Sequence, residues 1–234
     1  MKRSSERGNV LWFILIAIVL LGGLTMLLSR SGSSVDQSGD VEQMRIKASQ
    51  VLRYAKSIES ALEQMRMNGV SENSISFKNT ITATNYTNAA CPDDGNCRVF
   101  DVAGAGLTYQ KPPAGANDGS DWIFTGANNV GTAAGPVGTT QAASGNDLIM
   151  LMANANAALC LQINRDLEVG TSGTIPEDTT GIVTTEFTGT YADSLDIIDG
   201  DPTPFELDRK SAGCFTDTAA NPDVTYFYYV LLAR

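Results

Sequence analysis

The strongest hydrophobic pattern in the chain is an uncharged run from Val10 to Leu28, VLWFILIAIVLLGGLTMLL. As an α-helix, a run of this length would extend about 28 Å, close to the roughly 30 Å thickness of a bilayer core. Three basic residues precede the run, and Arg30 alone follows it closely. Because basic flanks stay on the cytoplasmic side, the pattern predicts one membrane-spanning helix with a cytoplasmic N-terminus and an exported remainder.

A second helical pattern extends from Val41 to Met65, where apolar residues recur every three or four positions. It predicts an amphipathic helix over 41–68, with Asp40 as N-cap and Gly69 as its C-terminal stop. Alanines make the apolar stripe thin, which favours close packing on a sheet over a coiled-coil dimer, although the dimer stays open. Residues 30–40 are rich in Ser, Gly and Asp and predict a flexible joint between the two helices.

Beyond Gly69 the hydrophobic period changes to two, which is typical of short strands. A Gly- and Ala-rich loop is expected over 128–145, and a short helix over 155–170. The fold class expected is α+β, a long N-terminal helix packed on an antiparallel sheet in one head domain, 69–234. Strands are predicted at 74–77, 81–87, 97–102, 107–110, 121–127, 147–152, 180–192 and 224–233.

Charge and composition exclude several function classes. The chain holds 16 Lys and Arg against 26 Asp and Glu, and four of the bases lie in the first 30 residues. An acidic body repels phosphate backbones, so nucleic-acid binding through a basic surface is not expected. The sequence has no histidine, the commonest side chain for proton transfer near neutral pH and for metal binding. We expect no catalytic residues, no enzyme activity and no cofactor.

Four cysteines lie in the part of the chain predicted to be exported, where disulfides persist. Cys91 and Cys97 flank a turn-forming sequence, and their proximity favours a bridge between them. Cys160 and Cys214 would then form the second bridge, although four cysteines allow three pairings. Their spacing fits no common zinc site, and four reduced thiols are the alternative.

An acidic segment near the C-terminus could offer oxygen ligands to calcium. A solvated acidic loop is the preferred interpretation, so we expect no metal site. Its carboxylates belong to Asp196, Asp199, Asp201, Glu206 and Asp208.

The leader MKRSSERG ends in Gly8 immediately before the apolar run, and in this the chain resembles type IV pilins and the pseudopilins of type II secretion. The resemblance implies that a prepilin peptidase cuts between Gly8 and Asn9 and methylates Asn9. It also implies that the apolar helix forms the core of a filament. Filament-shaft subunits usually carry a glutamate where this chain has Phe13, so the resemblance is to a minor subunit. The filament-core residues would include Val10, Phe13, Ile14, Leu20 and Leu24.

These features define a domain organisation and a function to test. The expected segments are a leader (1–8), a transmembrane and filament-core helix (9–29), the joint (30–40), the amphipathic helix (41–68) and a disulfide-bonded head (69–234). The expected function is a non-enzymatic pilin-like subunit in a bacterial inner membrane, with its head in the periplasm or on a cell-surface filament. Its partners would be membrane lipid, other pilin-like subunits, the peptidase and an assembly platform. The alternative is an uncleaved, single-pass periplasmic or surface binding protein.

Overall fold

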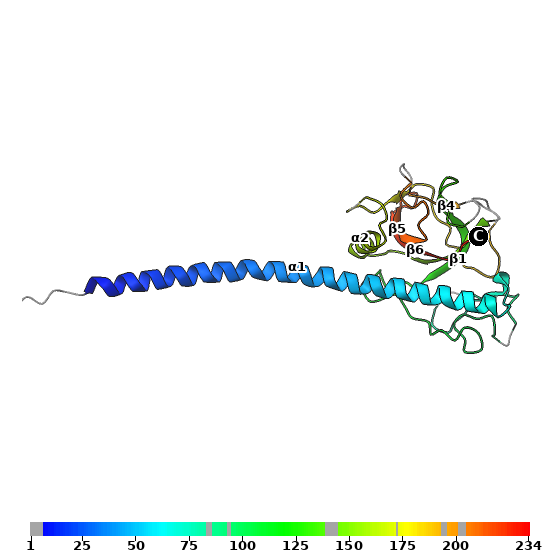
Figure 1. Ribbon diagram of the computed structural model, residues 1–234, viewed down its shortest axis with the longest axis horizontal. Coiled ribbons are helices and arrows are strands. Elements are labelled where there is room, and N and C mark those ends of the chain that lie inside the picture. The colour runs from blue at the N-terminus through cyan, green and yellow to red at the C-terminus, as the bar shows by residue number, and fades with distance from the viewer. Residues whose placement is uncertain are drawn as a thin grey trace, which may run out of the picture. The chain divides into compact units, whose positions relative to one another are not determined.

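The computed structural model describes residues 7–82, 86–92, 95–138, 145–171, 173–192, 196–200 and 205–234, except for the side chains of 7–11, 27–38 and 196. The chain forms two compact units, Met1–Gln43 and Met44–Arg234. The boundary between them falls inside the first helix, α1, which Figure 1 draws in blue to cyan. We call the second unit the head.

Helix α1 runs from Arg7 to Met67. Residues 30–40 lie within it, so Asp40 does not cap a helix as predicted, and the joint is helical. At its C-terminus, Gly69 adopts a φ of +91°, its N–H donates to the Arg66 carbonyl, and the Val70 N–H donates to the Met65 carbonyl. This pair of bonds is a Schellman motif, and it explains why the helix stops at the predicted glycine.

Eight shorter elements follow in the head. They are the 3-10 helix η1 (Glu72–Ser74), β1 (Ile123–Val130), β2 (Asp147–Met152), α2 (Ala157–Asp166), β3 (Glu177–Asp178), β4 (Asp196–Ile198), β5 (Ala212–Asp217) and β6 (Val224–Leu232). The Asn156 side chain accepts from the N–H groups of Ala158 and Leu159 and so caps α2.

The six strands form one mixed sheet in the order β3-β5-β6-β2-β1-β4. Its four central strands pair antiparallel, whereas β4 lies parallel to β1 and β3 lies parallel to β5. The predicted fold class, a long N-terminal helix on an antiparallel sheet, is therefore wrong. The two parallel edge strands are only two and three residues long, too short for a hydrophobic period to reveal them.

Both faces of the sheet are buried. On one face, Leu148, Met150 and Phe227 pack in a cluster with α2 and with the apolar stripe of α1. On the other face, Ile149, Leu151 and Tyr228 pack beneath loop residues in a second cluster. The stripe of α1 is buried from Ala48 onward at the predicted spacing: Ala48, Val51, Ala55, Ile58, Leu62 and Met65.

The segment between α1 and β1 packs through side chains rather than through strands. The predicted strands there are wrong among the described residues, where only Ser76 and Arg98 form an isolated bridge. Aromatic contacts hold the segment instead, because the Phe77 ring stacks on Phe124 at a centroid distance of 4.1 Å. Tyr86 adds an edge-on contact with Phe124, and its hydroxyl accepts the Phe124 N–H at 3.1 Å. The apolar alternation therefore reflects a folded loop with a buried aromatic face.

One further predicted strand is wrong, and one observed strand was not predicted. Residues 180–192 lie in a loop, although Phe187 is buried against Phe77. Strand β5 lies at 212–217, where no strand was predicted, and it pairs antiparallel with β6. By contrast, β2 matches the predicted bounds, and β6 ends one residue early.

Replacing Leu62 by Ala tests how much the stripe of α1 stabilises the head. Leu62 is fully buried in the cluster on the α1 face, so the substitution should lower the free energy of unfolding by about 2–5 kcal/mol. Urea denaturation of the full chain, followed by tryptophan fluorescence, measures the change. Met67→Ala is the control, because Met67 is 81% exposed on the same helix and should change stability by less than about 0.5 kcal/mol. Equal effects of the two substitutions would contradict packing through this stripe.

Candidate interaction surface

The first unit exposes a run of apolar side chains between Trp12 and Met26. Five consecutive residues, Trp12 to Ile16, are each between 39% and 68% exposed. Successive helical residues are about 100° apart, so these five encircle the helix and leave it no polar face. The predicted filament-core residues Phe13, Ile14, Leu20 and Leu24 all belong to this surface.

The only hydroxyl of this run is bonded within the helix. The Thr25 hydroxyl donates to the carbonyls of Leu21 and Gly22 at 3.0 and 2.9 Å. Gly22 and Gly23 have no neighbour within 4 Å of a built Cβ position, so they leave a shallow strip on the helix surface. The run therefore presents apolar atoms and a narrow strip of backbone, with its side-chain polar group already satisfied.

Part of the predicted anchor lies outside the described residues. These parts are residues 1–6 and the side chains of 7–11 and 27–29, which include the predicted processing residues Gly8 and Asn9 and the filament-core residue Val10. Within the described part of the chain, no helix meets the length and hydropathy needed to cross a membrane.

In the head, α1 is fixed to the sheet by polar contacts as well as by its stripe. The Tyr229 hydroxyl on β6 donates to Glu59 Oε2 at 2.5 Å, and Lys56 Nζ lies 2.8 Å from the same oxygen. Burial and the Glu59 carboxylate together raise the pKa of Tyr229, which keeps the hydroxyl protonated as a donor. These contacts hold the register of α1 against β6.

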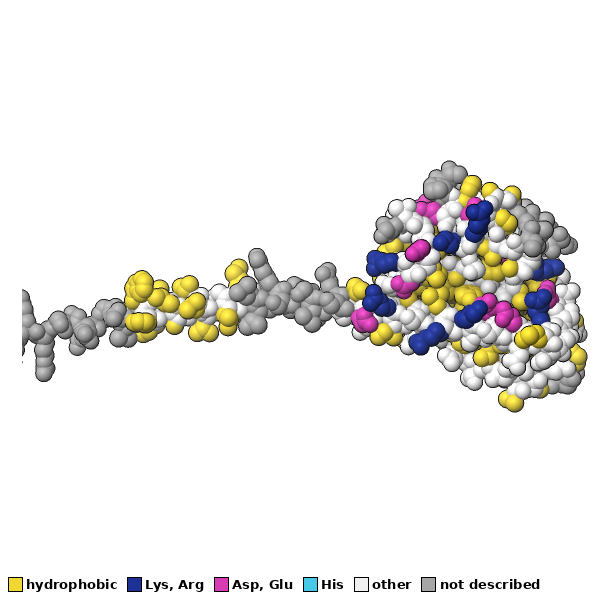
Figure 2. Space-filling model, in the orientation of Figure 1, with side chains coloured by type: hydrophobic (Ala, Val, Ile, Leu, Met, Phe, Trp, Pro, Cys, Tyr) yellow, Lys and Arg dark blue, Asp and Glu magenta, His cyan; other side chains and the backbone are white. Residues whose placement is uncertain are grey.

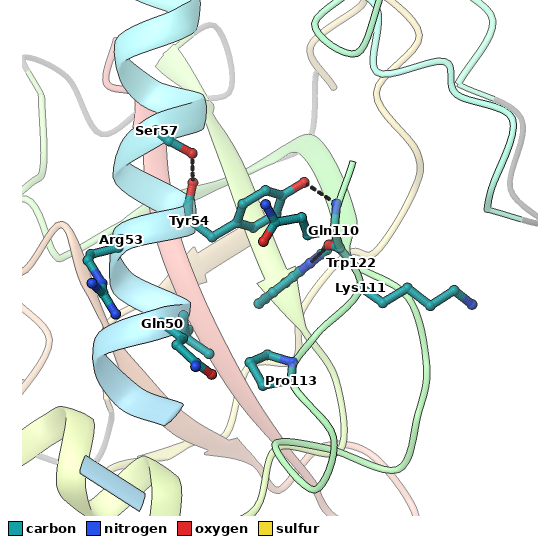
Figure 3. Close-up of a pocket in the computed structure, with 9 residues that line it drawn as sticks. Gln50, Arg53, Tyr54, Ser57, Gln110, Lys111, Pro113 and Trp122 are labelled. Carbon is teal, nitrogen blue, oxygen red and sulfur yellow. Dashed lines mark hydrogen bonds between the residues drawn. The ribbon is translucent and has the colours of Figure 1, made fainter. Parts of the chain in front are cut away.

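A groove opens between α1 and the loop that precedes β1, with a volume of about 460 Å³. Figure 3 shows Arg53 and Gln50 on the helix side, with Lys111 and Pro113 on the loop side. The Tyr54 hydroxyl, whose pKa burial raises to about 12, accepts the Gln110 N–H at 2.9 Å. The Gln110 carbonyl accepts the indole N–H of Trp122 at 2.8 Å. Sequence reasoning found no groove, because the two walls of the groove are far apart in the chain.

The two disulfides join Cys91 to Cys97 and Cys160 to Cys214, with Cα distances of 5.6 and 5.4 Å. This is the pairing that proximity favoured. The second bridge links α2 to β5 and is fully buried at both ends. Beside it, the Asn164 side chain donates to the Cys214 carbonyl and accepts the Cys214 N–H. Together these contacts clamp the short helix onto the sheet.

The acidic segment holds loops together through its described carboxylates. Glu206 accepts from the N–H and hydroxyl of Thr171, and Asp208 accepts from the N–H and hydroxyl of Thr132. Asp199 is buried. The Asp196 side chain and Asp201 lie outside the described residues, and the described part of the chain contains no group of three or more acidic or cysteine side chains that could hold a metal.

A fully buried carboxylate, Asp147, ties the C-terminus to the start of β2. It accepts the Val130 N–H at 3.1 Å and the Arg234 N–H at 3.0 Å. The Arg234 guanidinium lies 3.9 Å from the centre of the Tyr191 ring and 3.7 Å from Glu72. Burial raises the pKa of Asp147 to about 7, although both N–H bonds and the Arg234 charge oppose the rise. Sequence reasoning missed this network, because a single aspartate at the head of an apolar strand gives no signal of a contact 87 residues away.

Comparison with known proteins gives no match, whether to protein-family models, to curated proteins or to solved structures. The resemblance to type IV pilins therefore stays an interpretation of the leader and the apolar run. What the chain does is argued below from its own residues.

Removing the Cys160–Cys214 bridge should destabilise the head more than removing Cys91–Cys97. In the chain-entropy model, closing a loop of 54 residues contributes roughly 4 kcal/mol, and closing one of 6 residues roughly 2 kcal/mol. The two double Cys→Ala variants, compared by urea denaturation, measure this order. A greater loss from the Cys91 and Cys97 pair would contradict it.

The free energy of unfolding of the head should depend on pH through the protonation of Asp147. Between its ordinary pKa of 3.8 and the folded pKa of about 7, the folded state binds one more proton than the unfolded state. Stability contributed by this group is therefore complete below pH 4 and is lost as the pH rises through 7, with a limit of roughly 4 kcal/mol.

Asp147→Asn isolates this contribution from the other carboxylates of the head. The variant does not titrate, and its single amide oxygen cannot accept both backbone N–H groups as well as the carboxyl does. We expect the variant to be less stable than the natural chain at pH 4, and the difference to shrink by pH 8. Urea denaturation at several pH values measures it, and a difference that stays constant with pH would contradict the assignment.

Proposed function

We propose that this chain is a non-enzymatic, pilin-like subunit that is anchored in a bacterial inner membrane and assembles into a filament through the apolar part of α1. The observation that carries the proposal is the apolar surface between Trp12 and Met26, which encircles the helix. Helices that are apolar all round are buried in protein or in lipid. Such a surface is stable in water only when lipid or other protein chains cover it.

The size of this apolar surface sets the free energy that is gained when the surface is buried. Eleven large apolar side chains between Trp12 and Met26 are exposed. Burying each contributes about 1.5–3 kcal/mol when complete, and the partial exposure here gives a total on the order of 10–20 kcal/mol. Lipid tails supply that cover before assembly, and helices of neighbouring subunits supply it in a filament. Gly22 and Gly23 favour the second cover, because small residues let helices approach closely.

The head fits an exported, binding role better than a catalytic one. It is closed by two disulfides, which persist outside the cytoplasm. Several of its described carboxylates bond loop N–H and hydroxyl groups, and the chain has no histidine to serve as a general base. The head would therefore form the outer surface of the filament, in the periplasm or outside the cell.

Cleavage of the leader tests the proposal. The full chain is produced in a bacterium with an active prepilin peptidase, extracted from membranes with detergent and weighed intact by mass spectrometry. We expect a mature chain that begins at methylated Asn9, since the resemblance puts the cut after Gly8. Gly8→Val should retain the leader, whereas Gly39→Val, a glycine substitution in the same helix, should leave the cut unchanged.

Other outcomes of this measurement are equally informative. An intact Met1 would contradict the pilin-like proposal and favour the uncleaved, single-pass binding protein, whose ligand site would be the groove beside Tyr54. A chain that begins beyond residue 28 would contradict both, because the apolar run would then be a removed signal peptide.

A further inference from the structure

Charge is unevenly divided between the two parts of the head. Residues 44–67 carry five bases and two acids, whereas 68–234 carry seven bases and twenty acids. The helical part is therefore net positive on a strongly acidic body. Figure 2 shows Lys and Arg side chains in dark blue over the visible face of the head, with Asp and Glu side chains in magenta among them. A part with net positive charge on an acidic body attracts the acidic part of a second copy of the same molecule.

The groove beside Tyr54 gathers this positive charge. Arg53 and Lys111 are among the residues that line it, and no carboxylate is among the described lining residues. Lys47 extends toward the same loop, where its Nζ lies 3.0 Å from a built Cβ at Gly115. Two contacts limit the charge: Lys111 Nζ lies 3.2 Å from Asp121 Oδ1, and the Arg53 Nε–H donates to the Ser49 carbonyl at 3.1 Å. The groove as a whole nevertheless has a cationic rim.

The floor and the rim of the groove differ in what they can offer a ligand. At the floor, Trp122 is 1% exposed, and its N–H and the Tyr54 hydroxyl are both occupied by the Gln110 backbone. The rim carries the exposed side chains of Gln50, Arg53, Gln110 and Lys111. Guanidinium, ammonium and amide groups at this edge are donors that match carboxylate oxygens.

We propose that this groove receives acidic side chains from the head of a second copy of this chain. The inference rests on the proposed function, because assembly through α1 brings the heads close together. Exposed ion pairs contribute only about 0.2–1 kcal/mol each, too little to join free heads in solution. Tethered copies meet at an effective concentration near the millimolar range, where a few such pairs suffice to fix which faces touch.

A photoreactive benzoylphenylalanine at Gln110 tests the contact in the full chain in membranes. Illumination should produce crosslinked dimers, with the linked peptide of the second copy lying in its acidic part, 68–234. The matched control places the same group at Val102, which is 94% exposed and does not line the groove. Equal dimer yields at the two positions, or crosslinks from Gln110 to lipid or to another protein, would overturn the proposal.

Charge reversal tests its electrostatic basis. Arg53→Glu should lower the dimer yield from Gln110 about tenfold, because one attractive pair becomes a repulsive one. Salt at about 1 M, where the Debye length is roughly 3 Å, should have the same effect. Arg53→Gln should give an intermediate yield, and thermal unfolding shows whether each variant stays folded. A dimer yield that changes neither with the charge at position 53 nor with salt would overturn the proposal.

The outcome can be separated from that of the proposed function. Crosslinked dimers from a chain that retains its leader would leave the groove contact standing and overturn filament assembly. A chain correctly cut at Asn9 that gives no dimers from Gln110 would leave the assembly proposal standing and overturn the groove contact.

Discussion

The constraint on which the rest depends is that α1 must hide two different apolar surfaces from water. From Ala48 to Met65 it carries one narrow stripe, which is buried in a cluster with residues of the sheet and of the segment before β1. From Trp12 to Met26 it is apolar on every side, so no single sheet face could cover it. The first surface is buried by folding, whereas the second stays exposed, and under the proposed function lipid and neighbouring helices cover it.

Because the sheet is buried on both faces, the head has little apolar surface left for association. Its exposed large apolar residues are few in the described part of the chain: Ile46, Met67, Ile81, Val102 and Phe205. The aromatic side chains of β6 are also buried, because Phe227 packs on one face of the sheet and Tyr226 and Tyr228 pack on the other. Contacts made by the head must therefore be mainly polar.

The sequence predicted what depends on local period or on proximity. The stripe of α1, its stop at Gly69, strand β2 and the cysteine pairs were found because each follows from residues near one another in the chain. The mixed sheet was missed because β3 and β4 are too short to show a period. Between Gly69 and β1, alternating apolar residues were mistaken for strands, whereas the rings of Phe77 and Tyr86 contact each other in an aromatic cluster. The Asp147 network and the groove could not be predicted from the sequence, because each is formed by residues that are far apart in the chain.

The apolar surface of α1 and the polar surface of the head would contribute differently to assembly, the first to affinity and the second to specificity. Apolar contacts along Trp12–Met26 would be strong but weakly directed, because outside the strip at Gly22 and Gly23 the apolar surface encircles the helix and distinguishes little between rotations of a neighbour. Ion pairs at the rim of the groove are individually weak, yet like charges brought together are penalised, so they discriminate between one orientation and another. A subunit that took its cohesion from α1 would therefore need a polar feature on its head to choose its neighbours. The cationic groove on an acidic body meets that requirement with residues that the fold of the head already holds in place.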